Sequence, residues 1–144
     1  MLLAILTGLL LTMATVAIHS AGTSWWIAKL RQRGKEDETG ASLRTNWLLS
    51  TTATLLLSLQ LIEVLVWALV YLLIPTIEGI QTLEEAIYFS TVTFTTLGYG
   101  DVTLSGNWRM LSAIQGATGL LICGWSTAIL LAVVQAIRDR VESD

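Results

Sequence analysis

Three long runs without charged residues alternate with short polar stretches along the chain. No Asp, Glu, Lys or Arg occurs from Met1 to Ala28 or from Met110 to Ile137, and Glu63 is the only one from Thr45 to Ile77. Each run is longer than the ~20 apolar residues that a helix needs to cross the ~30 Å hydrocarbon core of a bilayer. The pattern predicts three membrane-spanning helices.

A shorter element precedes the third run, in "TLEEAIYFSTVTFTT". Thr82 followed three residues later by Glu85 forms a capping box, and the acids Glu84 and Glu85 suit the positive end of a helix dipole. The helix expected from Leu83 to about Thr95 is too short to cross the bilayer. Because two full spans flank it, the chain must dip into the membrane there and return.

Composition favours a membrane over water as the solvent. Of the 144 residues, 53 % are hydrophobic and only 13 % are charged, against roughly 25 % in soluble domains. The alternative is a soluble all-α bundle, but so short a chain could not cover three such helices with polar surface. The single cysteine, Cys123, excludes an intrachain disulfide and argues against a thiolate metal site. We expect no nucleic-acid partner.

The basic residues predict the orientation. Five of the eight lie in a polar linker with Gly34 and Gly40 as helix breakers: Lys29, Arg31, Arg33, Lys35 and Arg44. The positive-inside rule makes this linker and the C-terminus cytoplasmic, and puts Met1 and segment 75–107 outside. We expect a multi-pass protein of a bacterial or archaeal plasma membrane. We expect its first helix to be retained, because it lacks the basic n-region of a signal peptide and its uncharged run is too long.

Segment 75–107 carries more acids than bases. Glu78, Glu84, Glu85 and Asp101 face only one base nearby, Arg109. If these acids form a rim on the outer side of the protein, that rim would raise the local concentration of cations. The alternative is an ordinary solvated loop, and both interpretations stay open.

The stretch "TTLGYGD", Thr95 to Asp101, follows the short helix. Irregular backbone at membrane depth is tolerated only where protein buries it or where it lines a water-filled path. Gly98 and Gly100 can adopt φ > 0 without steric cost, so successive carbonyls can point along one axis. Four such loops would stack rings of oxygens that replace the water shell of a cation.

This stretch, with the short helix before it and a span on either side, resembles the selectivity-filter region of tetrameric potassium channels of the bacterial two-transmembrane type. The resemblance covers about residues 46–137, and the first helix is an addition to it. It implies a homotetramer in the lipid bilayer, with K⁺ held by the carbonyls of Thr96, Leu97, Gly98 and Tyr99 and by the Thr96 hydroxyl. Gly100 supports the backbone conformation, and Leu97 stands where valine or isoleucine is commoner.

The resemblance also assigns supporting roles around the filter. Tyr99 would pack outward against Tyr88 and Phe89, and Asp101 would lie within reach of the Tyr88 hydroxyl. Val92 stands where some relatives have a carboxylate one turn before the filter, so the carboxylate pair of those relatives is missing here.

The inner helix resembles the family too, in "TGLLICG". The resemblance places Gly119 and Gly124 where the inner helix often has a hinge and a small packing residue, and Gly119 is either a bending point or a close-packing position. It also implies that Thr127, and with it Leu131, faces the cavity below the filter. Gly119 and Thr127 are the gating candidates of this helix.

Glu63 also needs an explanation, because an acid near mid-membrane is costly and usually has a partner or a task. Counting ~1.5 Å per residue from the helix ends puts it level with Thr118. We expect a neutral Glu63 that donates a hydrogen bond to the inner or pore helix; a pH-sensing gate is the alternative. His19 lies nearer the cytoplasmic side, so a direct His19–Glu63 pair is not expected.

We therefore expect an all-α membrane protein that conducts K⁺ passively and is not an enzyme. The alternatives are a non-conducting or regulatory accessory subunit with the same fold, an ion-transporter subunit, and an intramembrane enzyme, for which His19, Glu63 and Cys123 lack catalytic spacing. The expected segments are an N-terminal helix 1–28, a linker 29–45, a pore domain 46–137 and a tail 138–144. Within the pore domain they are the outer helix 46–74, pore helix 83–95, filter 96–100 and inner helix 107–137.

Overall fold

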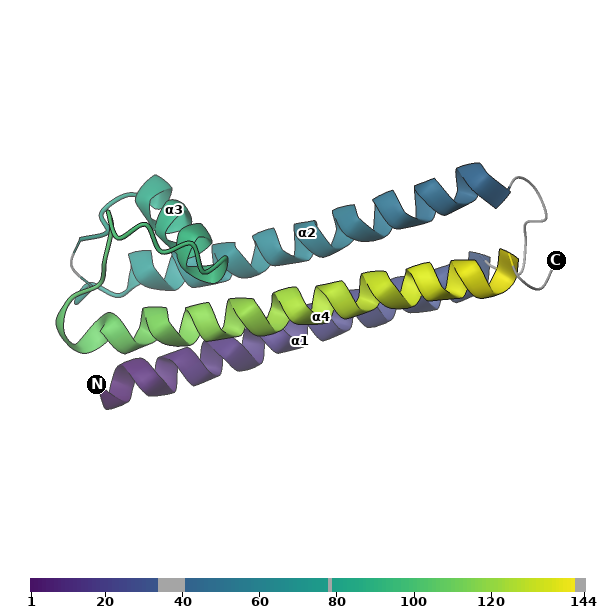
Figure 1. Ribbon diagram of the computed structural model, residues 1–144. Coiled ribbons are helices and arrows are strands. Elements are labelled where there is room, and N and C mark those ends of the chain that lie inside the picture. The colour runs from purple at the N-terminus through teal and green to yellow at the C-terminus, as the bar shows by residue number, and fades with distance from the viewer. Residues whose placement is uncertain (34–40, 78, 142–144) are drawn as a thin grey trace.

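The computed structural model describes residues 1–33, 41–77 and 79–141, and these form helices joined by irregular loops (Figure 1). The helices are α1 (Leu2–Arg33), α2 (Ala41–Leu73), α3 (Leu83–Phe94), a 3₁₀ turn η1 (Gly106–Trp108) and α4 (Arg109–Val141). Three helices are long and apolar enough to cross a membrane, over Leu2–Gln32, Thr45–Leu73 and Gly106–Asp139. The prediction of three spans with a short helix between the second and third is confirmed.

The long helices extend beyond the apolar runs that predicted them. α1 continues through Lys29 to Arg33 and α2 begins at Ala41, so part of the expected linker is helical. Lysine, arginine and glutamine are good helix formers in water, so a helix need not end where its apolar run ends. α4 likewise continues to Val141. Gly34, Lys35, Gly40 and Glu78, which the sequence singled out, lie outside the described residues.

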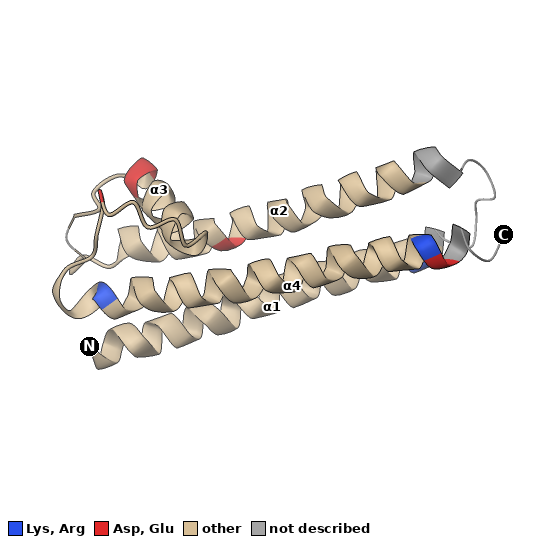
Figure 2. Cartoon of the chain, in the orientation of Figure 1, with Lys and Arg blue, Asp and Glu red and all other residues tan. Residues whose placement is uncertain are grey.

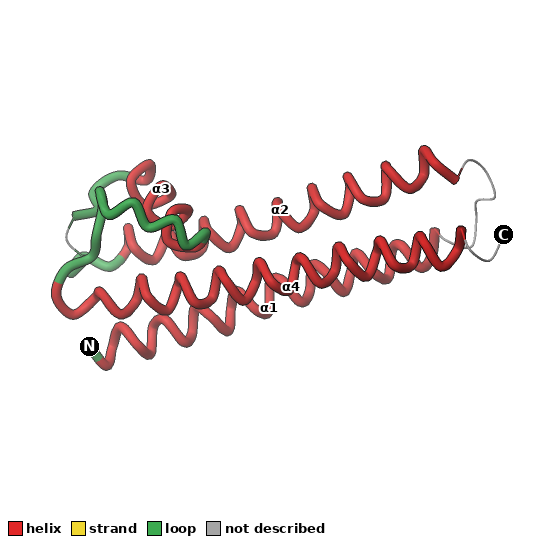
Figure 3. Tube along the Cα trace, in the orientation of Figure 1, coloured by secondary structure: helices red, strands yellow, loops and turns green. Residues whose placement is uncertain are grey.

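The short helix α3 has the cap that its sequence predicts. The Thr82 hydroxyl accepts a hydrogen bond from the Glu85 N–H at 3.2 Å, and Glu85 Oε2 accepts one from the Thr82 N–H at 3.0 Å. Twelve residues make a helix of about 18 Å, well short of a bilayer. α3 lies beside one end of α2, and the chain returns from it to the start of α4 as irregular loop (Figure 3).

A hydrogen bond at the start of α1 fixes its direction relative to α4. The Met1 ammonium group donates to Asn107 Oδ1 at 3.3 Å, so α1 and α4 start at the same end and run parallel. This end also holds α3 and the loops around it, and we call it the loop end. Charged residues gather at the two ends of the molecule, and Glu63 is a lone acidic position along α2 (Figure 2).

Helix α1 is joined to α2 and α4 by hydrogen bonds between buried or half-buried side chains, which we call the polar ladder. Its contacts are Thr12–Thr118 at 2.7 Å, Trp67–Thr15 at 3.0 Å, His19–Glu63 at 3.0 Å and Trp26–Thr52 at 3.0 Å. Polar side chains that bond across helices are a common source of association in membranes, where lipid is as apolar as leucine. The extra helix is therefore packed into the bundle.

The contact between His19 and Glu63 corrects two expectations. His19 Nδ1 lies 3.0 Å from Glu63 Oε1, and both side chains are fully buried. Glu63 therefore has its partner on α1, not on the inner or pore helix. Its other oxygen, Oε2, is buried without a hydrogen-bond partner within the described part of the chain.

The error came from treating the helix ends as level. His19 Nε2 lies 3.4 Å from the Ser126 hydroxyl, so Glu63 is level with Ser126 and not with Thr118. Those two residues are eight positions apart on α4, or about 12 Å. The start of α4 thus lies further out along the bundle axis than the end of α2.

Gly119 lets α3 and α4 approach closely. A Cβ at this position would lie 1.9 Å from the carbonyl oxygen of Phe94, which is backbone and cannot rotate away. Gly116, one turn earlier on the same helix, would place its Cβ at an ordinary 3.6 Å from the Thr93 carbonyl. The contact favours the packing role of Gly119, and a bend there stays a prediction.

We expect Gly119→Ala to destabilise the protein by about 1–3 kcal/mol or more, because an overpacked site forces the backbone to shift. Gly116→Ala is the matched control, and its cost should be below ~0.5 kcal/mol because alanine favours a helix over glycine. Chemical unfolding of each variant in detergent micelles measures the difference. Equal stability of the two variants would contradict the packing of α4 on Phe94.

Candidate ion-conducting site

The loop after α3 is attached to the C-terminal end of that helix. The N–H of Thr96 donates to the Thr93 carbonyl at 3.0 Å, and the N–H groups of Leu97 and Gly98 donate to the Val92 carbonyl at 3.0 and 3.3 Å. The loop therefore takes its starting position and direction from α3. A shift of α3 would move the carbonyls to which residues 96–98 are bonded.

The backbone of residues 96–100 alternates in the sign of φ. Thr96, Gly98 and Gly100 have φ of 61°, 55° and 82°, whereas Leu97 and Tyr99 do not have positive φ. Such an alternation allows successive carbonyl groups to point to a common side, as the glycines of this stretch predict. A positive φ at a β-branched residue such as Thr96 is a true outlier. Strain of this kind persists at functional sites.

The carbonyls of this loop are free to bind something else. Among the described residues, no backbone N–H donates to the carbonyl oxygens of residues 96–100. The segment is also exposed in the single chain, with Leu97 59 % and Tyr99 69 % accessible. The loop thus offers a row of unpaired main-chain oxygens on a surface of the chain, which can coordinate a cation.

Tyr88 joins α3 to the end of the loop. Its hydroxyl donates to Asp101 Oδ2 at 2.6 Å, so the contact expected from the sequence is present. This hydrogen bond holds the pKa of the Asp101 carboxyl below its usual range and raises the pKa of the Tyr88 hydroxyl. The backbone N–H groups of Asp101 and Val102 also lower the pKa of the carboxyl.

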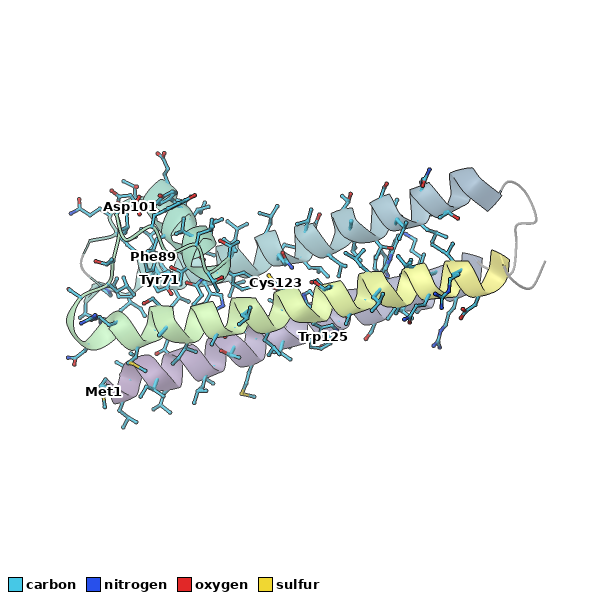
Figure 4. All side chains as sticks on the ribbon, in the orientation of Figure 1. Met1, Tyr71, Phe89, Asp101, Cys123 and Trp125 are labelled. Carbon is cyan, nitrogen blue, oxygen red and sulfur yellow. The ribbon has the colours of Figure 1, made fainter. Side chains whose placement is uncertain are left out.

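The expected packing of Tyr99 on Tyr88 and Phe89 is not formed within one chain. Phe89 is buried and contacts Tyr71 of α2 edge-on, with 5.0 Å between ring centroids (Figure 4). Tyr99 is mostly exposed and has no ring contact among the described residues. Phe89 is therefore part of the contact between α3 and α2.

Three further residues around α3 were not predicted from the sequence. Tyr71, Ser90 and Gln115 come from α2, α3 and α4 and form a buried hydrogen-bonded cluster behind the loop. A glutamine in an otherwise apolar span is a signal that could have found it, because a buried amide needs partners. Its partners, however, lie 25 and 44 positions away in the chain, so the sequence alone does not identify them.

Gly119 is buried against α3, whereas Gly124, Thr127 and Leu131 lie on the exposed side of α4. The Thr127 hydroxyl donates to its own helix, to the Cys123 carbonyl at 2.9 Å. Leu131 is 56 % exposed, and a Cβ at Gly124 would meet nothing within 4 Å. This face is open in the single chain, and the roles of Thr127 and Leu131 in a cavity stay predictions.

Comparison with known proteins agrees with this geometry. A family described as "Ion channel" matches residues 59–136, more than half of the chain. Over 81 residues the chain is 33 % identical to the uncharacterized membrane protein YdjJ of Bacillus subtilis (strain 168). That match covers 51 % of this chain but only 24 % of the relative. No solved structure matches the chain.

Tyr88→Phe is expected to raise the pKa of Asp101 towards its ordinary value, because the strongest hydrogen bond to the carboxylate is lost. A carboxyl whose pKa is lowered by folding stabilises the protein above its unfolded pKa, and this contribution disappears as the pH falls through the folded value. The variant should therefore lose less stability than the wild type on acidification. Carbonyl NMR titration of Asp101 in micelles measures the pKa.

Tyr99→Phe serves as the control for this titration. It removes a neighbouring hydroxyl that is not among the groups lowering the pKa of Asp101. An unchanged pKa in Tyr88→Phe would show that the hydrogen bond does not hold the carboxyl in solution.

Proposed function

This chain belongs to the ion channel family, and from that premise we propose that four copies form a potassium-selective channel that conducts K⁺ passively. An ion channel is not an enzyme, so the intramembrane enzyme is no longer a candidate. The proposed ion ligands are the carbonyls of Thr96, Leu97, Gly98 and Tyr99 and the Thr96 hydroxyl, with Gly100 shaping the backbone.

The exposed backbone of the loop carries the proposal. A membrane offers no water to unpaired carbonyls, and each one left in lipid costs several kcal/mol. The loop of one chain leaves its carbonyls unpaired and its side chains exposed, so it needs other copies or a water-filled path around it. Four copies around one axis supply both, and give the stacked oxygen rings that bind dehydrated K⁺.

The side chains of the loop favour a main-chain site over a side-chain site. Leu97 and Tyr99 bring no charge, and Asp101 is already engaged by Tyr88. Only the carbonyls and the Thr96 hydroxyl remain as ligands. Oxygen dipoles of this kind suit a monovalent ion that must be released again as easily as it is bound.

The distribution of charges supports an orientation with the loop end outside the cell. The basic residues cluster near the other end, which the positive-inside rule assigns to the cytoplasm. Glu84, Glu85 and Asp101 would then lie on the outer side, where they attract cations towards the mouth. The rim and the filter would act on the same ion.

The gating residues are proposals with different support. Gly119 is proposed as a close-packing position on the evidence of its contact with Phe94. Thr127 is proposed to face the cavity, because its side of α4 is not covered by the same chain. Glu63 is proposed to influence gating through α1, because its partner His19 lies on that helix.

Purified protein in liposomes should take up K⁺ well in excess of Na⁺, and Gly98→Ala should abolish most of this flux. Alanine is strained at the positive φ of residue 98, and relief of that strain would turn a carbonyl out of line. A radioactive or fluorescent flux assay with both ions gives the result.

Gly106→Ala is the matched control for strain. Gly106 has φ of 56°, close to the 55° of Gly98, and an added Cβ meets nothing within 4 Å at either position. It lies outside the loop, so its variant should keep its flux. Absence of flux in the correctly assembled wild type would favour the accessory subunit, and equal flux of K⁺ and Na⁺ would overturn the potassium assignment.

A further inference from the structure

A buried polar cluster holds α3 from the side opposite its loop. It consists of Tyr71 of α2, Ser90 of α3 and Gln115 of α4, whose exposed fractions are 1 %, 0 % and 0 %. Each of the three helices that meet here contributes one member. The cluster lies next to the ring contact between Tyr71 and Phe89.

Every polar side-chain atom in the cluster has a partner. The Tyr71 hydroxyl donates to Gln115 Oε1 at 2.7 Å, and Gln115 Nε2 donates to the Ser90 hydroxyl at 2.7 Å and to its carbonyl at 3.3 Å. The Ser90 hydroxyl donates in turn to the Val64 carbonyl of α2 at 2.8 Å. A fully satisfied buried network defines one geometry, because any shift leaves a desolvated group unpaired.

Gln115 is the one residue in this network that joins α4 to α3. Among the described residues, the side-chain hydrogen bonds between these two helices are those of Gln115 to Ser90. At Gly116 and Gly119, α4 approaches the backbone of α3 without a side chain between them. Packing of that kind sets a distance, but a directional bond is needed to set rotation and height along the helix.

The position of Ser90 connects this bond to the loop. Ser90 lies two residues before Val92, whose carbonyl accepts the N–H groups of Leu97 and Gly98. A rotation or slide of α3 would move this acceptor and with it the carbonyls of residues 96–98. Val92 is apolar and offers no side-chain bond to the loop, so its position depends on what holds α3 elsewhere.

We propose that Gln115 is a positioning residue for ion selection: by fixing α3 relative to α4, it holds the loop carbonyls at the spacing that favours K⁺ over Na⁺. The proposal rests on the potassium-channel function proposed above. Gln115 does not touch the ion, and it acts through Ser90 and the Val92 carbonyl.

The test is the K⁺/Na⁺ permeability ratio, measured from reversal potentials of the full-length protein in planar bilayers. Gln115→Leu should lower this ratio about tenfold, the effect of about one lost buried hydrogen bond. The variant should still conduct. A general loss of stability would reduce the number of channels but would not change the ratio of those that open.

Thr118→Val is the matched control. Thr118 is also buried on α4, less than one turn from Gln115, but its hydroxyl bonds to Thr12 of α1 instead of α3. Its variant should keep the wild-type ratio. Ser90→Ala should lower the ratio, and combined with Gln115→Leu it should add little, because both remove the same bond.

If Gln115→Leu does not assemble, Tyr71→Phe gives the same test with a smaller change. It removes one hydroxyl and leaves Gln115 Oε1 unpaired, so the ratio should fall, though less than tenfold. A wild-type ratio in conducting Gln115→Leu or Tyr71→Phe channels would overturn the positioning role. A wild-type protein without preference for K⁺ would overturn the proposed function itself, and the positioning role with it.

Discussion

The need to satisfy main-chain polar groups without water governs this structure. In the three long helices this need is met internally, because the backbone N–H and C=O groups bond to each other within the same helix. The loop of residues 96–100 does not meet it in this way, and its carbonyls have no backbone partner among the described residues. Such a segment is stable in a membrane only if something outside the single chain completes it. The alternation of φ allows those unpaired oxygens to point to a common side.

The surrounding helices are organised to hold that loop in place. α3 is capped at Thr82, joined to the loop end through Tyr88 and Asp101, and fixed from behind by Gln115. Gly119 allows the backbone of α3 to contact α4 directly. These contacts lie within the loop-end half of the bundle. Helix α1 is held by the polar ladder, which runs from Thr12–Thr118, beside Gly119, to Trp26–Thr52 near the other end of the bundle. The side chains that attach α1 are therefore different from those that hold α3.

Features set by neighbouring residues could be predicted from the sequence, whereas contacts between distant helices could not. The capping box of Thr82 and Glu85 and the glycines of the loop follow from local chemistry, and the Tyr88–Asp101 contact from a family resemblance. The pairing of His19 with Glu63 depends on the relative height of two helices, which apolar length does not define. The partners of Gln115 depend on which faces meet. A buried polar residue in a span indicates that it has a hydrogen-bond partner, but not which residue that partner is.

Helix α1 has a consequence for how this protein is divided into modules. The segment shared with the ion channel family begins at residue 59, yet Glu63 and Trp67 within it bond to α1. If α1 were removed, those groups would face hydrocarbon. The shared segment is thus not autonomous in this chain, and a chimera that grafts it onto another protein would have to replace its polar residues as well.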